Sequence, residues 1–181
     1  ITTPDLSLTS IAGDIGTSTA SRFTTDAANL TANAANGSVF INNTSSAGMT
    51  LGASGANTVS GTFDVVAANA ITTSGDIAAN NIAILTGDGN IAVGANVSGN
   101  VVTLTANDGI TTNSGSEISG NNIALTATNA GLAIDGDITA NNALSLTAHN
   151  DILNGNFTGA ITTPDLSLTS IAGDIGTSTA S

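Results

Sequence analysis

The strongest constraint on this chain is an internal repeat without a single mismatch. Residues 1–21 and residues 161–181 both read ITTPDLSLTSIAGDIGTSTAS, so the outer period is 160 residues. A sequence that returns to itself unchanged indicates a fold that continues from one unit into the next. We therefore assign residues 1–160 to one full tandem unit and residues 161–181 to the first coil of the next, identical unit.

A second period of about 20 residues runs inside this unit. It is seen when the dipeptide Leu-Thr and its equivalents are aligned, and two further apolar columns, starting at Ile71 and Ile77, keep a similar spacing. Three apolar columns per period predict three walls around one core. The predicted leucine ladder consists of Leu8, Leu30, Val65, Leu85, Leu104, Leu125, Leu146 and Leu168.

The local pattern within each period is that of short strands. In the stretch 144–147, Leu-Ser-Leu-Thr, apolar and polar residues alternate, and clusters of Asn, Gly and Asp separate such stretches. One coil cannot bury its apolar side alone, whereas stacked coils form a continuous core. The sequence thus predicts an all-β fold, a parallel three-faced β-helix (β-solenoid) with coils of about 20 residues.

Two details of this solenoid follow from the spacing. An asparagine ladder at one corner is predicted from Asn81, Asn100, Asn121 and Asn142, because stacked amides can bond to each other along the axis. The interval between Leu30 and Val65 is longer than the others, so we expect irregular coils or a loop at about residues 38–65.

Composition excludes several classes of function. The chain carries 13 acidic residues and a single Arg, which gives a formal net charge of −12. One cation cannot neutralise a phosphate backbone, so we expect no nucleic-acid partner. We also expect no membrane insertion, because no apolar run approaches the roughly 20 residues of a spanning helix.

The acidic residues are candidates for catalysis or metal binding. Asp76, Glu117 and Asp137 recur on one column, yet they stand at corners before an inward Ile, where a solvated, turn-forming role fits better than glycosidase chemistry. Asp88, or Asp135 with Asp137, could hold calcium loosely. We therefore predict no enzyme activity, no catalytic residue, no metal site and no cofactor beyond loosely bound Ca²⁺.

Several segments resemble a known family. The motif LSLTSIAGDIGT and its relatives IALTATNAGLAI, VVTLTANDGITT and ALSLTAHNDILN are similar to the repeats of filamentous-haemagglutinin-type exoproteins, large adhesins exported by two-partner secretion. The resemblance implies a right-handed β-helix and a secreted, extracellular shaft at the cell surface with roles in adhesion or cell contact.

These observations lead to one main hypothesis and two alternatives. The main hypothesis is the structural shaft of a secreted, repetitive surface fibre or adhesin, with identical units as partners and a host, neighbouring-cell or glycan surface as a further candidate partner. The first alternative is a binding module that recognises a glycan or partner protein through a loop near residues 42–61. The second alternative is a subunit of a self-assembling extracellular filament.

Overall fold

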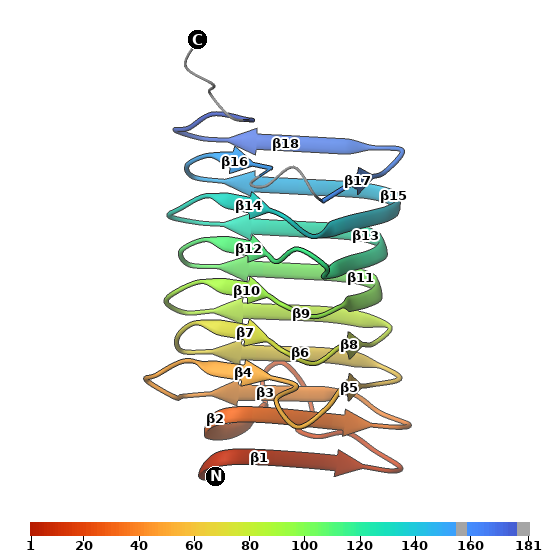
Figure 1. The fold of residues 1–181 in the computed structure, drawn as a ribbon. Coiled ribbons are helices and arrows are strands. Elements are labelled where there is room, and N and C mark those ends of the chain that lie inside the picture. Colours follow the sequence, from red (N-terminus) through yellow and green to blue (C-terminus); the bar gives the residue numbers. More distant parts are fainter. Residues whose placement is uncertain (155–158, 177–181) are drawn as a thin grey trace.

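The computed structural model describes residues 1–154 and 159–176, and every regular element within them is a β-strand. The strands pair in parallel and wind into a β-solenoid of about eight coils, each of roughly 21 residues (Figure 1). This confirms the predicted fold class. Within the described part of the chain, no helix has the length and apolar character needed to cross a membrane.

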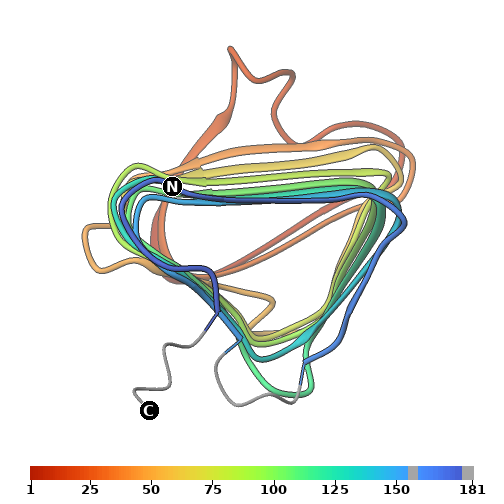
Figure 2. The ribbon, with the colours of Figure 1, turned by 90° about the horizontal axis from the view of Figure 1, so that it is seen from above.

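Viewed along the axis, the regular coils have a roughly triangular outline (Figure 2). The long wall is built from β3 (Val39–Asn43), β6 (Thr62–Ala67), β9 (Asn81–Thr86), the later residues of β11 (Val97–Ala106), β13 (Glu117–Ala127) and β15 (Asp137–Ala148), and β18 (Leu166–Ser170). The back wall is built from β4 (Met49–Leu51), β7 (Ile71–Thr73), β10 (Ile91–Val93), β12 (Ile110–Thr112), β14 (Leu132–Ile134) and β16 (Ile152–Leu153). The short wall is built from β5 (Asn57–Thr58), β8 (Ile77–Ala78), the first residues of β11, β13 and β15, and β17 (Ile161–Thr162).

Two of the predicted apolar columns lie in register over their whole length. The column on the short wall is Ile77, Val97, Ile118, Ile138 and Ile161. The column on the back wall is Ile71, Ile91, Ile110, Leu132 and Ile152, and Ile175 bridges to Ile152. Apart from Ile161 and Ile175, these side chains are buried, so apolar side chains at equivalent positions of neighbouring coils pack on one another in the core.

On the long wall the predicted leucine ladder needs a correction at Leu85. The pairs Leu104–Leu125, Leu125–Leu146 and Leu146–Leu168 are in register, but below Leu104 lies Ile84 rather than Leu85. Leu85 is 41% exposed and Ile84 is buried. Alternation along the strand decides this, because a slip of one residue moves a side chain to the opposite face of a sheet.

The predicted ladder is also wrong at Leu30 and Leu8. Val65 is in register with Ile41, which the alignment of Leu-Thr dipeptides skipped. Leu30 pairs with Leu51 on the back wall, and Leu8 pairs with Ala32. Because Ile41 supplies the missing member, the long interval at 38–65 holds a complete coil of β3, β4 and β5.

The first coils differ in shape from those above them. The strand β2 (Phe23–Ala34) begins on the long wall, where it pairs with β3, and continues without a break below β4. Its last residue, Ala34, bridges to Val59 beyond β5. The strand β1 (Thr2–Ser10) pairs along β2, so one extended strand covers what the upper coils divide into two walls.

Candidate functional site

Amide side chains form a ladder at the corner between the short and long walls. Asn121 Nδ2 donates to Asn100 Oδ1 at 2.7 Å, and Asn141 Nδ2 donates to Asn121 Oδ1 at 3.2 Å. Asn142, the predicted member, donates instead to Asn122 Oδ1 at 2.6 Å. The register shifts between Gly120 and Asn122, because β15 carries one more residue than β13 at this corner.

The predicted first member of this ladder, Asn81, lies elsewhere. It is in register with Val101, whereas the backbone N–H of Asn100 bonds to the carbonyl of Asn80. The placement is again shifted by one residue, as at Leu85. The amide ladder therefore joins three coils through Asn100, Asn121 and Asn141.

The acidic column has a defined structural role. Asp76 Oδ1 accepts a hydrogen bond from the backbone N–H of Asn96 at 3.0 Å, and Asn96 Oδ1 accepts one from Glu117 N at 3.0 Å. Asp137 Oδ1 does the same for Ala160 N at 2.8 Å. Each side-chain oxygen thus binds a backbone N–H of the following coil, which holds two coils together where strand pairing is interrupted.

The candidate metal ligands take part in similar contacts. Asp88 Oδ1 accepts hydrogen bonds from Gly89 N at 3.0 Å and from Asn107 Nδ2 at 3.4 Å. Across residues 1–154 and 159–176, the structure contains no group of three or more His, Cys, Asp or Glu side chains that could hold a metal ion. The Asn107 contact joins Asp88 to the following coil, whereas the Gly89 contact lies within the turn of Asp88 itself.

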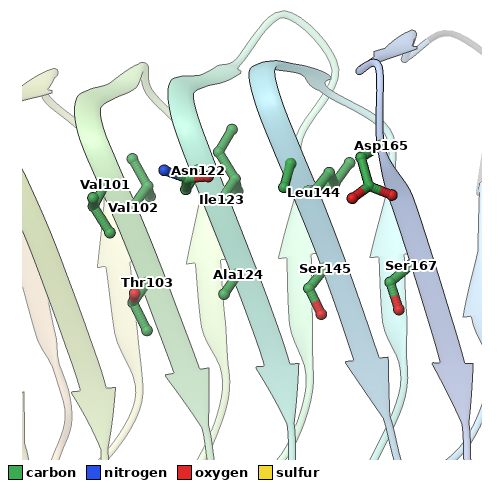
Figure 3. A pocket seen from close by; sticks show the side chains of 11 residues that line it. Val101, Val102, Thr103, Asn122, Ile123, Ala124, Leu144, Ser145, Asp165 and Ser167 are labelled. Atoms are coloured by element: carbon green, nitrogen blue, oxygen red, sulfur yellow. The ribbon is translucent and has the colours of Figure 1, made fainter.

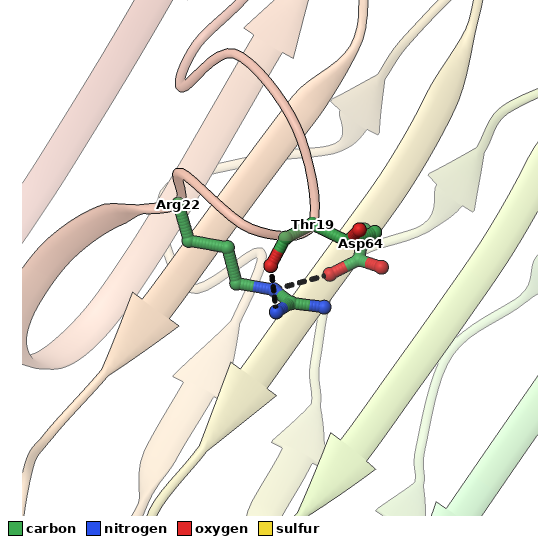
Figure 4. A network of polar contacts seen from close by, with 3 residues as sticks. All are labelled: Thr19, Arg22 and Asp64. Atoms are coloured by element: carbon green, nitrogen blue, oxygen red, sulfur yellow. Dashed lines mark hydrogen bonds and ion pairs between the residues drawn. The ribbon is translucent and has the colours of Figure 1, made fainter.

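The largest departure from the regular outline is the segment 16–22, which lies between Ile15 and the start of β2 and projects from the long wall (Figure 2). Arg22 fastens it (Figure 4). Its Nε donates to Asp64 Oδ1 at 2.7 Å, and its Nη1 donates to the carbonyl oxygen of Thr19. The Arg22 and Asp64 side chains are 23% and 9% exposed, so the ion pair is partly shielded from water.

In the lower half of the solenoid, residues 1–67, buried asparagine side chains bond to backbone groups that are not paired with a neighbouring strand. Asn43 is fully buried, and its Oδ1 accepts hydrogen bonds from Thr25 Oγ1 and Ala27 N, both at 2.9 Å. Its Nδ2 donates to the carbonyl oxygen of Ala27 at 3.0 Å. Asn57 Oδ1 accepts from Ala32 N at 2.8 Å. These amides satisfy backbone groups at bends where strand neighbours do not.

A shallow groove of about 270 Å³ crosses the long wall over four coils (Figure 3). Small outward side chains floor it, including Ala124 and Ser145, while Val101 and Asp165 stand at its two ends. Its lining is mainly apolar. The groove could accept an extended, weakly polar chain, and sequence reasoning missed it because it depends on which small residues stack above one another.

The two copies of the repeat lie at opposite ends of the solenoid and use opposite edges. In the first copy, β1 pairs with the coil that follows it, from Thr2–Asp26 to Ser10–Ala34. In the second copy, β17 and β18 pair with the coil that precedes them. The same sequence therefore has a paired upper edge in one copy and a paired lower edge in the other.

The fold and its axial ladders define the chain as a parallel β-solenoid repeat protein. Comparisons of the chain with protein families, with curated proteins and with solved structures gave no match. The likeness to filamentous-haemagglutinin-type repeats is carried by the sequence motifs.

Proposed function

We propose that this chain is a section of the structural shaft of a secreted, repetitive cell-surface fibre or adhesin, and that it has no catalytic role. The observation that carries this proposal is the direction of its polar contacts. Strand pairing, the amide ladder and the carboxylate contacts all connect one coil to the next. A load along the axis is thereby shared among many parallel bonds.

The dimensions of the unit suit a spacer. Seven or eight coils at about 4.8 Å each give a rise of roughly 34 to 38 Å per 160-residue unit. A rod with a dry aliphatic core and hydrogen bonds along the axis is stiff. The motif resemblance supports an extracellular location, identical units as partners in one fibre, and contact with a host, neighbouring-cell or glycan surface.

Cryo-electron microscopy of chains that carry two, four and six tandem 160-residue units tests the shaft. We expect straight rods with a layer spacing of about 4.8 Å and a length that grows with the number of units. Compact or bent particles would contradict the proposal. A digest with a protease of broad specificity adds a second readout, because native rods with paired backbones should resist cleavage, whereas trypsin could cut even the unfolded chain only at Arg22.

Binding through the region 42–61 is the second candidate function. A recess of about 260 Å³ lies at the corner Ala47–Thr50, beside Asn29 and Thr72. Asn29, Thr50 and Thr72 bring polar side chains to its lining that could bond to glycan hydroxyls. Glycan-array binding that Thr50→Ala and Thr72→Ala abolish, with unchanged circular dichroism, would favour recognition over a spacer role, and binding unaffected by both changes would speak against it.

A further inference from the structure

We infer that the recess beneath the projecting segment 16–22 is a binding site for a neutral sugar, recognised through two adjacent hydroxyl groups. Arg22 supplies the hydrogen-bond donor and Asp64 the acceptor. The inference goes beyond the proposed shaft function, because a spacer needs no ligand, and it concerns a different surface from the corner at Ala47–Thr50. It is carried by the unengaged atoms of the Arg22–Asp64 ion pair and by the surface around them.

The Arg22 recess, as we call it, lies between the segment 16–22 and the outer face of the long wall. It has a volume of about 330 Å³, and a second recess of about 160 Å³ adjoins it, because Arg22 and Val66 line both. The residues Thr24, Asn42 and Val66 are in register on β2, β3 and β6, so three paired strands form the floor. Further polar groups in the lining come from Thr19 and Ser21.

The segment that covers the recess is held in shape by its own hydrogen bonds. The N–H of Thr17 donates to the carbonyl of Ser21 at 3.1 Å, and the N–H of Ser21 donates to that of Ser18 at 3.0 Å. At its base, Gly16 has a φ of +75°, and a Cβ atom there would lie 2.4 Å from the carbonyl oxygen of Phe40. The segment is therefore a preformed wall, which reduces the ordering that a ligand must impose.

The ion pair keeps one donor and one acceptor free. Arg22 Nε donates to Asp64 Oδ1 and Arg22 Nη1 to the carbonyl of Thr19, which fixes the plane of the guanidinium group. Within residues 1–154 and 159–176, Arg22 Nη2 and Asp64 Oδ2 make no hydrogen bond, and neither is a fully buried atom (Figure 4). Both residues line the smaller recess, so both atoms are available to a ligand there.

A free N–H and a free carboxylate oxygen of one ion pair complement two neighbouring hydroxyl groups. One hydroxyl accepts a hydrogen bond from Arg22 Nη2, and the other donates one to Asp64 Oδ2. Both bonds are charge-assisted, which makes them stronger than bonds between neutral groups. Hydroxyl groups on adjacent carbon atoms are a general feature of sugars, so the ion pair selects this class of ligand.

Apolar surface beside the ion pair suits the ring of a sugar. Val66 and Leu85 are in register on the outer face, and Leu85 is 41% exposed. A sugar ring presents C–H groups on its faces and hydroxyl groups on its rim. Its face can cover Val66 and Leu85 while the rim bonds to Arg22 and Asp64, which combines apolar contact with a few placed polar groups.

The charge of the recess favours a neutral sugar over an acidic one. The charges of Arg22 and Asp64 cancel, and the chain as a whole has a formal net charge of −12. A uronic acid or a sulfated sugar would meet a cation that is already paired, in the field of a strongly acidic protein. A neutral sugar makes the same two hydrogen bonds without that repulsion.

An NMR titration of the whole chain tests the site. The probes are the methyl glycosides of glucose, galactose and mannose, each compared with its uronic acid. We expect at least one neutral glycoside to shift the backbone amides of residues 17–24, 42 and 64–66, with a dissociation constant in the millimolar range. No shift at these residues with any of the three, up to the solubility of the probes, would overturn the inference. Tighter binding of the uronic acid would also overturn it, in favour of an anion site.

Three variants and a control test the named residues. Arg22→Gln and Asp64→Asn should each weaken binding about tenfold or more, because each removes a charge-assisted bond. Both changes also loosen the segment 16–22, so Leu85→Ala, on the outer face, adds a variant that keeps the segment fastened and should weaken binding several-fold. The control, Asp137→Asn, makes the same chemical change at a corner away from the recess and should leave binding unchanged.

The result for the sugar site is separate from that for the shaft. Equal affinity in the native chain, Arg22→Gln and Leu85→Ala would overturn the site, and rods seen by electron microscopy would still support the shaft function. Absence of rods from chains of tandem units would overturn the shaft function instead, whereas shifts confined to the recess would still support the sugar site.

Discussion

The upper coils, residues 71–154, and the lower coils, residues 1–67, reach the same architecture by different means. In the upper half, Ile and Leu stack in register at a period of 19 to 22 residues, and polar contacts lie at the corners. In the lower half, the segment 16–22 interrupts the long wall, and Asn43 is buried in the core. Where the spacing is regular, each coil makes the same apolar contacts as the one before it. Where the spacing is irregular, polar side chains must bond to backbone groups that lack a strand partner.

This comparison has a physical basis. A parallel coil that matches its neighbour in length pairs most of its own backbone groups, so buried hydroxyls such as those of Thr73 and Thr112 are needed only at its corners. Where an insertion or bend breaks the match, an unpaired N–H or C=O would remain buried, at a cost of about 1 to 3 kcal/mol per group. Asn43 and Asn57 provide the missing partners in the lower half.

The largest effect should come from the stacked core of the upper half. Leu104→Ala removes a fully buried side chain between Ile84 and Leu125 and should lower the free energy of unfolding by about 2 to 5 kcal/mol. Leu85→Ala, on the outer face, should cost less than about 0.5 kcal/mol. Urea denaturation followed by circular dichroism measures both, and similar losses would contradict the register described above.

The buried amide of the lower half should come next. Asn43→Ala leaves the N–H and C=O of Ala27 without their side-chain partner, and we expect a loss of about 2 to 3 kcal/mol. Hydrogen exchange should show increased opening of β2 and β3 while the upper coils stay protected. Uniform opening of the whole solenoid would mean that the two halves unfold as one unit.

Removing the Arg22–Asp64 ion pair, which fastens the segment 16–22, should have a smaller effect. Arg22→Gln removes a partly exposed ion pair and should cost about 1 kcal/mol. Asp64→Asn should make trypsin cut faster at Arg22, because the segment is no longer fastened to β6. A double-mutant cycle from urea melts gives the coupling energy, and zero coupling would show that the contact holds nothing in place.

The corner ladder of the upper half should have the smallest effect. Asn121→Ala breaks bonds to Asn100 and Asn141 that are open to water, so we expect a loss of no more than about 1 kcal/mol. Ser119→Ala, two residues away on the same strand, serves as its control. A loss as large as that of Asn43→Ala would show that exposed and buried amides contribute equally, contrary to our account of the two halves.

Sequence reasoning identified the fold from its periods, and two apolar columns were predicted residue by residue. The prediction of the leucine ladder failed where segments were aligned by residue type without counting which face of the strand each residue occupies. The dipeptide Leu85-Thr86 resembles Leu104-Thr105, yet the run Ile82, Ala83, Ile84 fixes which side faces inward. Ile41 was missed for a related reason, because Asn rather than Thr follows it.

The amide ladder shows the same limit at a corner. Asn141 and Asn142 are adjacent in the sequence, and either could continue the column that holds Asn121. Only the extra residue in β15 decides that Asn141 does. The Arg22–Asp64 contact could not be predicted at all, because 42 residues separate the two and the winding of the chain over β3 brings them together.

The sequence by itself determined the period, the parallel stacking and the residues that face inward on the short and back walls, because apolar side chains recurring at equal intervals can be buried only by stacking. Only the tertiary structure decided which wall each copy of ITTPDLSLTS occupies. The two copies are identical, yet one lies along β2 and the other on β15. A strand takes its wall from the edge it pairs with, and that edge is formed by residues outside the repeat.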